Sequence, residues 1–138
     1  NRKEIIISVQ SENENKTFIA ASLAELKMCP FITEVKTISM SKILPMDADP
    51  GMAYLDFRKI SFPVTIRKWK AGDYFFPFGM NRKKKLSDYF IDGKFSRLEK
   101  EKTLIMEAGG EIVWIIGIRI DNRFRLTAST QKVLVLKA

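Results

Sequence analysis

Short alternating runs of hydrophobic and polar residues predict β-strands along much of the chain. Phe62, Val64 and Ile66 occupy every second position of one run, which is the period of a half-buried strand, and Pro63 suits the start or edge of such a strand. Residues 17–28 fit a strand that passes into a helical turn. Further strands are expected at residues 4–9, 32–39, 53–58, 103–107 and 133–136.

The most hydrophobic run of the chain covers residues 111–120. In a single extended strand, Ile112 and Trp114 would share one face with the later isoleucines, while Val113 and Ile115 make the opposite face apolar too. A strand that is buried on both faces belongs in the interior of a sheet or sandwich. A Gly-Gly hairpin turn is expected just before it.

Residues 86–92 predict a short amphipathic helix. Leu86, Tyr89 and Phe90 are spaced i, i+3 and i+4, so that they lie on one helical face. Gly93 follows at the position where a left-handed residue would close the last turn.

A second short helix is expected from residue 96 to residue 102. Ser96 and Glu99 have the spacing of a capping box, in which each side chain accepts a hydrogen bond from the other residue's backbone N–H. The whole pattern predicts a β-dominated α+β fold, mostly an antiparallel sheet or sandwich, with one or two short helices.

Composition favours one domain from a reducing compartment. The chain has 138 residues, of which 46% are hydrophobic, and this is enough for a single core. The lone Cys29 excludes an intrachain disulfide. No secretory signal or membrane-length apolar run is visible, and the chain starts without Met. We therefore expect a cytoplasmic piece of a longer protein.

The net charge of +8 is unevenly distributed. Residues 1–60 hold eight cations and eight anions, whereas residues 61–138 hold sixteen cations and eight anions. Such an excess in one part of the chain indicates an acidic partner, most often nucleic acid, with a membrane surface as the competing candidate.

Four consecutive cations at residues 82–85 stand immediately before the predicted helix at residues 86–92. Cations oppose the helix macrodipole at this end, whereas phosphate would be attracted by both the side chains and the backbone N–H groups. A solvated basic loop is the alternative interpretation.

Two further groups of cations could belong to the same surface. Arg67 and Lys68 precede Trp69, which could stack on a base or fill the interior. Three arginines, at residues 119, 123 and 125, surround a predicted turn after the hydrophobic run and could meet the lysine cluster. Sequence does not place them together.

Residues for catalysis are sparse. The chain has no His, no Gly-rich phosphate loop before a helix and no Cys-x-x-Cys pair. Asp88 and Asp92 are expected to be offset by Lys84 and Lys85 on the helix surface. Asp47 and Asp49 favour turn formation over a metal site. This chain is therefore not expected to be an enzyme unaided or to hold a metal or cofactor.

An ordered set of short motifs covers residues 53–137. They are Phe62-Pro63-Val64-Thr65-Ile66-Arg67, Gly72-Asp73, Phe76-Pro77-Phe78-Gly79-Met80, Lys84-Lys85-Leu86-Ser87-Asp88-Tyr89-Phe90-Ile91-Asp92, Ile112-Val113-Trp114-Ile115-Ile116-Gly117, Arg119-Ile120-Asp121 and Arg123-Phe124-Arg125-Leu126-Thr127. In this order and spacing the segment resembles the C-terminal domain of tRNA(Ile)-lysidine synthase, the TilS family.

The resemblance implies a module that holds tRNA, largely at the acceptor stem. A separate N-terminal PP-loop ATPase domain would use ATP, with Mg, and lysine to convert the wobble cytidine to lysidine. The resemblance also implies a fold related to a domain of the phenylalanyl-tRNA synthetase β subunit. Residues 53–138 would form this module, and residues 1–52 a β-rich extension or linker. Family members often have Pro and Arg where this chain has Ser96 and Lys100.

We expect the basic residues of the later half to bind tRNA through backbone phosphates, with the aromatic residues mainly filling the core. The alternative is a structural or protein-interaction domain whose basic face docks on an acidic partner domain. Peripheral membrane attachment is disfavoured because the helix is short. The candidate RNA-binding residues are Arg67, Lys68, Arg82, Lys83, Lys84, Lys85, Lys94, Arg97, Lys100, Arg119, Arg123 and Arg125.

Overall fold

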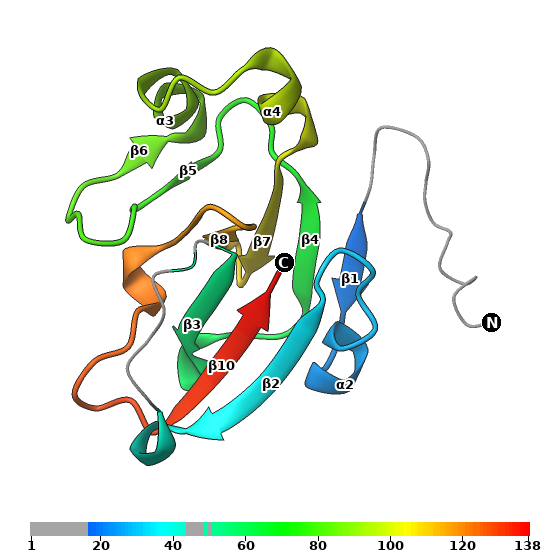
Figure 1. Cartoon of the computed structure of the whole chain (residues 1–138), viewed down its shortest axis with the longest axis vertical. Helices are drawn as coiled ribbons and strands as arrows, with labels where there is room; N and C mark the ends of the chain where they lie inside the picture. Colours follow the sequence, from blue (N-terminus) through cyan, green and yellow to red (C-terminus); the bar gives the residue numbers. More distant parts are fainter. Residues whose placement is uncertain (1–16, 44–48, 50) are drawn as a thin grey trace.

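Antiparallel β-sheets dominate the computed structural model, which describes residues 17–43, 49 and 51–138 (Figure 1). Within this part of the chain, the strands form three sheets and the helices are short. The predicted β-dominated α+β fold is therefore confirmed. The strand predicted at residues 4–9 lies outside the described residues, as does Asp47 of the predicted turn. No helix in the described ranges is long and apolar enough to cross a membrane.

The larger sheet has the strand order β1-β4-β7-β8-β9, with antiparallel pairing throughout. Pro63 precedes β4, and Val64 and Ile66 on this strand are fully buried. The alternating hydrophobic positions thus correctly predicted a half-buried strand, with Pro63 just before its start. The strands are β1 (Phe18–Ala20), β4 (Val64–Lys68), β7 (Leu104–Ala108), β8 (Glu111–Ile115) and β9 (Arg119–Ile120).

A second sheet has the order β2-β10-β3, and a small hairpin joins β5 to β6. Strand β10 pairs with both neighbours, so that Val135 lies opposite Lys36 on one side and Tyr54 on the other. The strands are β2 (Glu34–Ser39), β3 (Met52–Asp56), β5 (Tyr74–Phe75), β6 (Lys84–Lys85) and β10 (Lys132–Lys137).

The two larger sheets pack against each other through one hydrophobic core. Met106 and Trp114 from the first sheet belong to the same buried cluster as Leu55, Leu134 and Leu136 from the second. Burial of these aliphatic and aromatic side chains supplies most of the stabilisation of such a layered fold.

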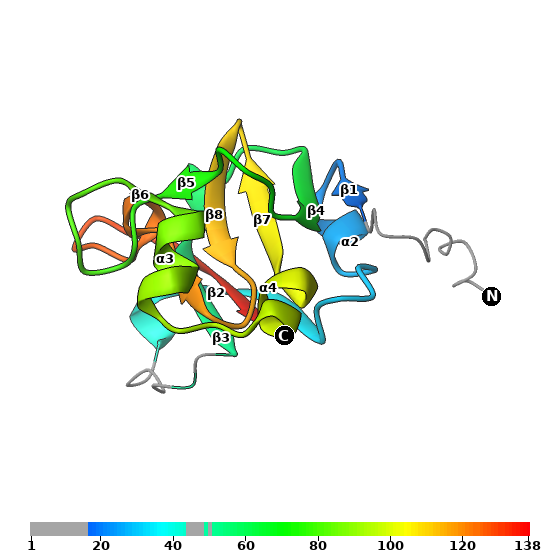
Figure 2. The same ribbon diagram turned by 90° about the horizontal axis from the view of Figure 1, so that it is seen from above.

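Helices α3 (Leu86–Asp92) and α4 (Arg97–Lys102) follow the β5–β6 hairpin. The hairpin and α3 cover the other face of the larger sheet. Phe75 and Phe90 from this layer pack with Ile105, Ile112 and Ile115 of β7 and β8. Strand β8 is therefore buried on both faces, as its sequence predicted. Figure 2 shows α3 and α4 on this side, with β2 and β3 beyond the sheet.

Short helices connect the strands. The predicted capping box at the start of α4 is present, because Ser96 Oγ accepts from the Glu99 N–H at 3.0 Å and Glu99 Oε1 accepts from the Ser96 N–H at 2.7 Å. The α-helices are α2 (Leu23–Leu26), α3 (Leu86–Asp92) and α4 (Arg97–Lys102), and the 3₁₀ helices are η1 (Met40–Lys42), η2 (Phe57–Lys59) and η3 (Asn122–Phe124).

The described part of residues 1–52 packs into the same layers. Strand β1 pairs with β4, and β2 pairs with β10. Leu26 and Cys29 are buried in the core that the two sheets share. A strand passing into a helical turn was correctly predicted for residues 17–28. The domain boundary after residue 52 stays a prediction.

The prediction of one strand over residues 111–120 is wrong. Strand β8 ends at Ile115, and a tight turn returns the chain as β9, which pairs antiparallel with β8. The Ile118 N–H donates to the Ile115 carbonyl at 2.8 Å, and Gly117 has a φ of 78°. A residue without a Cβ adopts this left-handed conformation readily, so the chain turns there despite its apolar sequence.

The predicted shared face of Ile112 and Trp114 is also wrong. Met106 lies opposite Trp114 but Glu107 lies opposite Ile112, so Val113 is an extra residue in β8. This β-bulge places Ile112 in the cluster beneath α3 and Trp114 in the core between the sheets.

The left-handed residue that ends α3 is one position later than predicted. Gly93 has a φ of −84°, whereas Lys94 has a φ of 57°. The Phe95 N–H donates to the Phe90 carbonyl at 2.9 Å and the Lys94 N–H donates to the Ile91 carbonyl at 3.0 Å, which are the two bonds of a Schellman ending. A Cβ at Gly93 would lie 2.8 Å from Phe95 Cε1, so close approach explains this glycine.

Candidate nucleic-acid interface

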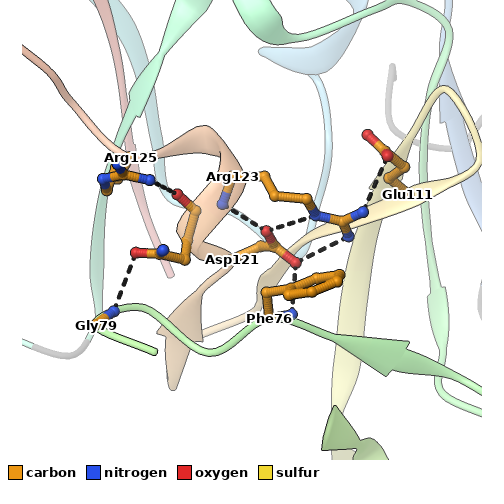
Figure 3. A network of polar contacts seen from close by, with 7 residues as sticks. Phe76, Gly79, Glu111, Asp121, Arg123 and Arg125 are labelled. Carbon is orange, nitrogen blue, oxygen red and sulfur yellow. Dashed lines mark hydrogen bonds and ion pairs between the residues drawn. The ribbon is translucent and has the colours of Figure 1, made fainter. Parts of the chain in front are cut away.

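Two segments far apart in the sequence are joined at one edge of the molecule. The Phe78 N–H donates to the Ile120 carbonyl at 3.0 Å, and the Asn122 N–H donates to the Phe76 carbonyl at 2.6 Å. The Gly79 N–H donates to Asn122 Oδ1 at 3.1 Å (Figure 3). These bonds fix the loop between β5 and β6 against the β9–η3 segment, as both Figure 1 and Figure 2 show.

Asp121 lies at the centre of this junction and is fully buried. Its carboxylate accepts hydrogen bonds from the Phe76 N–H at 2.9 Å and from the Arg123 N–H at 2.7 Å. The Arg123 guanidinium donates to both carboxylate oxygens, each at 3.0 Å, and to Glu111 at 2.9 Å (Figure 3). These hydrogen bonds offset the free-energy cost of burying the charged carboxylate.

Arg123 is consequently held inside this network. Its guanidinium also lies over the Phe76 ring, 4.4 Å from the ring centroid. Burial acts to lower the pKa of Arg123, but the hydrogen bonds and negative charge of Asp121, with Glu111, outweigh it and raise the pKa. Arg123 is thus permanently charged, and the carboxylates of Asp121 and Glu111 already neutralise its charge.

Four exposed cations surround the junction. Arg119 donates through Nη2 to the Phe78 carbonyl at 3.1 Å, and Arg125 donates through Nη1 to the Asn122 carbonyl at 2.8 Å. Lys83 Nζ lies 4.4 Å from the centroid of the Tyr74 ring. We call Arg82, Lys83, Arg119 and Arg125 the cationic surface.

The charge of the cationic surface is not neutralised by its described surroundings. None of its four side chains forms an ion pair with a carboxylate of residues 17–43, 49 or 51–138. Their guanidinium contacts are to backbone carbonyls, which position the groups but leave their net charge in place. Arg119 thus meets the loop between β5 and β6, and Arg125 lies in the segment that is bonded to this loop through Asn122. The sequence had left this placement open.

Arg67 is bound to internal carboxylates. Its Nη1 and Nη2 donate to the two oxygens of Asp73, each at 3.0 Å, and Nε donates to Glu107 at 3.0 Å. The hydrogen bonds that Arg67 donates to Asp73 are the largest cause that raises the pKa of Arg67; burial opposes them, and Glu107 adds to them. The side chain is only 17% exposed. Its guanidinium therefore stabilises the fold by binding internal carboxylates.

The remaining candidate cations lie around α3 and α4. Lys84 forms an ion pair with Asp92 and is half-buried. The Arg97 side chain is 90% exposed, and its Nε lies 3.9 Å from Glu101 Oε2. Lys68 and Lys100 are half-buried. The two other candidates, both exposed, are Lys85 and Lys94.

Trp69 is half-buried and packs against the fold, which is the second of the two roles considered from the sequence. Its Nε1 donates to the Lys100 carbonyl at 2.8 Å, and its ring packs edge-on against Phe90 at a centroid distance of 4.9 Å. With the polar end satisfied and the ring packed, Trp69 is a structural contact between β4 and α4.

Phe78 is an exposed aromatic residue that the sequence interpretation did not single out. Aromatics were expected mainly to fill the core, which holds for Phe75 and Phe90, both fully buried. Phe78 is 46% exposed and its neighbour Met80 is 38% exposed. The signal available in the sequence was its place between Pro77 and Gly79, because side chains at the corner of a turn point outward.

The described residues offer few ligands for a metal ion. No group of three His, Cys, Asp or Glu residues in the described ranges could hold a metal ion. Asp49 Oδ1 accepts from the Gly51 N–H at 2.8 Å, which is turn chemistry, as predicted. A small pocket beside Arg67 and Arg123 is lined by carboxylates that these two arginines already bind.

The sequence profile described as the TilS substrate C-terminal domain matches residues 64–136 of this chain. The chain belongs to this family. The tRNA(Ile)-lysidine synthase of Parabacteroides distasonis is 42% identical over 135 residues, which cover 98% of this chain and 31% of that protein. The chain thus spans about a third or less of the length of the first curated relatives it matches.

Two solved structures share the fold of this TilS C-terminal domain. A crystal structure of a TILS C-terminal domain has a TM-score of 0.64 at 20% identity, covering 88% of this chain and 95% of that one. An N-terminal fragment of the phenylalanyl-tRNA synthetase β subunit from Pyrococcus horikoshii has a TM-score of 0.54 at 19% identity, covering 62% of this chain and 27% of that one. The family resemblance and the fold relation expected from the sequence are therefore confirmed.

Proposed function

We propose that this chain is the tRNA-binding C-terminal module of a tRNA(Ile)-lysidine synthase. Its membership of the TilS C-terminal family supports this role, as does its relative in Parabacteroides distasonis. In this proposal, a separate PP-loop domain uses ATP, with Mg, and lysine to modify the wobble cytidine. The module described here contributes binding energy and orientation for the tRNA, with no catalytic residue of its own.

The observation that carries the proposal is the assembly of the cationic surface from two distant segments. Backbone hydrogen bonds hold Phe78 to Ile120 and Asn122 to Phe76, so the four cations are presented on a rigid base. A fixed set of cations can match the spacing of phosphates along an RNA backbone and release their condensed counterions. Double-stranded RNA is recognised mainly by shape and by backbone contacts, which suits binding at the acceptor stem.

We choose among the candidate RNA contacts by the hydrogen bonds and ion pairs that each cation already makes within the chain. Arg67 and Arg123 direct their donors at internal carboxylates, so we assign them to the fold and not to RNA. Lys84 contributes less because Asp92 offsets its charge. The proposed main contacts are Arg82, Lys83, Arg119 and Arg125, with Lys68, Lys85, Lys94, Arg97 and Lys100 as secondary contacts.

Titration of tRNA binding against salt concentration tests the proposal. Replacing Arg82 and Lys83 together by Ala should reduce the slope of log affinity against log salt by about 1.4–1.8, since each lost phosphate contact removes roughly 0.7–0.9. Helix α2 lies on the opposite side of the molecule from the β5–β6 loop in Figures 1 and 2. Lys27, the exposed residue that ends α2, provides the control Lys27→Ala, which should leave the slope unchanged.

An acidic polymer without ribose, such as polyglutamate, separates this function from docking on an acidic protein. The proposal expects tRNA to bind much more tightly than polyglutamate at equal salt. Equal binding of both polymers would favour the protein-docking function, and absence of tRNA binding at low salt would overturn the proposal.

A further inference from the structure

Phe78 is held rigidly while its side chain stays in solvent. Its N–H donates to the Ile120 carbonyl at 3.0 Å, and its carbonyl accepts from Arg119 Nη2 at 3.1 Å. The Met80 N–H donates to the Pro77 carbonyl at 2.9 Å and closes a turn around it. Both polar groups of the Phe78 backbone are therefore fixed by groups outside its own turn, although 46% of the residue is exposed.

The space in front of this turn is open. Gly79 has a φ of 89°, and a Cβ built on it would meet no heavy atom within 4 Å. Phe78 occupies the preceding corner of the turn, where a side chain projects away from the chain. Tyr74 and Met80, from the same hairpin, are also exposed.

Cations lie near the backbone of Phe78 and in the same hairpin. Arg119 is attached to the carbonyl of Phe78 itself, and it makes no hydrogen bond through Nε or Nη1 to the described residues. Lys83 lies over the Tyr74 ring at 4.4 Å. An aromatic face with cations beside it has the composition of a site for a single nucleotide, where the ring stacks on the base and the cations bind the flanking phosphates.

We infer that Phe78 is a stacking platform for an unpaired nucleobase of the bound RNA, with Arg119 at the phosphate beside it. This inference rests on the proposed function. The base must be unpaired because bases inside an A-form duplex are stacked on each other and offer no free face. Such a base occurs where a helix ends or is interrupted, and the cationic surface would bind the neighbouring duplex.

The probes are a blunt RNA hairpin and the same hairpin with a short unpaired tail at its 3′ or its 5′ end. The 138-residue chain should bind one of the two tailed hairpins about 5- to 30-fold more tightly than the blunt hairpin. This factor of about 5 to 30 is the lower part of the range that stacking of a base on an aromatic residue supplies. Phe78→Leu keeps an apolar side chain without a flat ring and should abolish this preference, whereas Phe78→Trp should retain it.

A matched control removes an exposed apolar side chain elsewhere. Strand β1 lies at the opposite side of the molecule from the β5–β6 loop in Figures 1 and 2. Ile19 belongs to β1 and is 61% exposed. Ile19→Ala should leave the preference for the tail intact. A 2-aminopurine in the tail should change its fluorescence on binding to the wild-type chain and not on binding to Phe78→Leu.

The outcomes distinguish this inference from the function on which it rests. Salt-dependent binding of all the hairpins with equal affinity would overturn the platform and leave the tRNA-binding function standing. A preference for the tail that survives Phe78→Leu would also overturn it. Binding of no hairpin at low salt would overturn both.

Discussion

The buried Asp121 carboxylate binds the Arg123 guanidinium through both oxygens, each at 3.0 Å. The same carboxylate accepts the Phe76 N–H at 2.9 Å, so one side chain connects η3 to the β5–β6 loop (Figure 3). The pair therefore determines where the loop lies, and with it the position of the cationic surface.

Asp121→Ala should destabilise the chain by about 2–4 kcal/mol, because it leaves Arg123 without its main partner and the Phe76 N–H without an acceptor. Glu111→Ala is the matched control, since Glu111 binds the same guanidinium but is half-exposed, at 50%. It should cost less than about 1 kcal/mol. Urea unfolding followed by circular dichroism measures both, and equal losses would contradict the central role of Asp121.

Lys83 and Lys84 are neighbours in sequence but should differ in their effect on tRNA binding. Lys83 belongs to the cationic surface, whereas Lys84 is half-buried and paired with Asp92. Lys83→Ala should lower the slope of log affinity against log salt by about 0.7–0.9, and Lys84→Ala by less than half of that. A larger effect for Lys84 would mean that its ion pair opens when RNA binds.

Gly117 should tolerate Asn better than Val. Its φ of 78° is strained for a β-branched residue, which should cost about 1–2 kcal/mol in Gly117→Val, whereas Asn adopts this conformation more readily. Space is not the limitation, because a Cβ at this position would lie 4.0 Å from its nearest neighbour, Ala138 Cβ. Thermal unfolding of both variants checks this, and equal melting temperatures would argue against a backbone origin.

Cys29 should make stability fall at alkaline pH. Burial raises the pKa of its thiol from the ordinary 9.0 to about 11, against the opposing effect of backbone hydrogen bonds from Phe31 and Ile32. Above pH 9.0 the unfolded chain loses the thiol proton while the folded chain retains it, so the free energy of unfolding decreases until the folded thiol also ionises near pH 11.

Comparison with Cys29→Ala isolates this contribution from the other groups that titrate in the same range. The wild-type chain should lose about 1–3 kcal/mol more than the variant as the pH rises through this window. Urea unfolding at a series of pH values measures the difference. Parallel curves for the two chains would contradict it, as would rapid alkylation of the folded thiol at neutral pH.

Much of the fold could be predicted because its signals are local. The alternation at residues 62–66, the i, i+3, i+4 spacing on α3 and the Ser96–Glu99 capping box each depend on residues within one turn or one strand. The errors fell where a single residue changes the backbone. Gly117 turns a hydrophobic run back on itself, and Val113 shifts the faces of β8 by one position.

The amino-acid sequence was sufficient to identify a β-rich TilS C-terminal domain and the cations of its later half, since composition and motif order are properties of the chain alone. Only the tertiary structure decided which of these cations are paired with carboxylates. Arg67 and Arg123 meet carboxylates from other segments, whereas Arg119 meets the β5–β6 loop across some forty residues. Such pairings depend on how the sheets pack, and no local pattern encodes them.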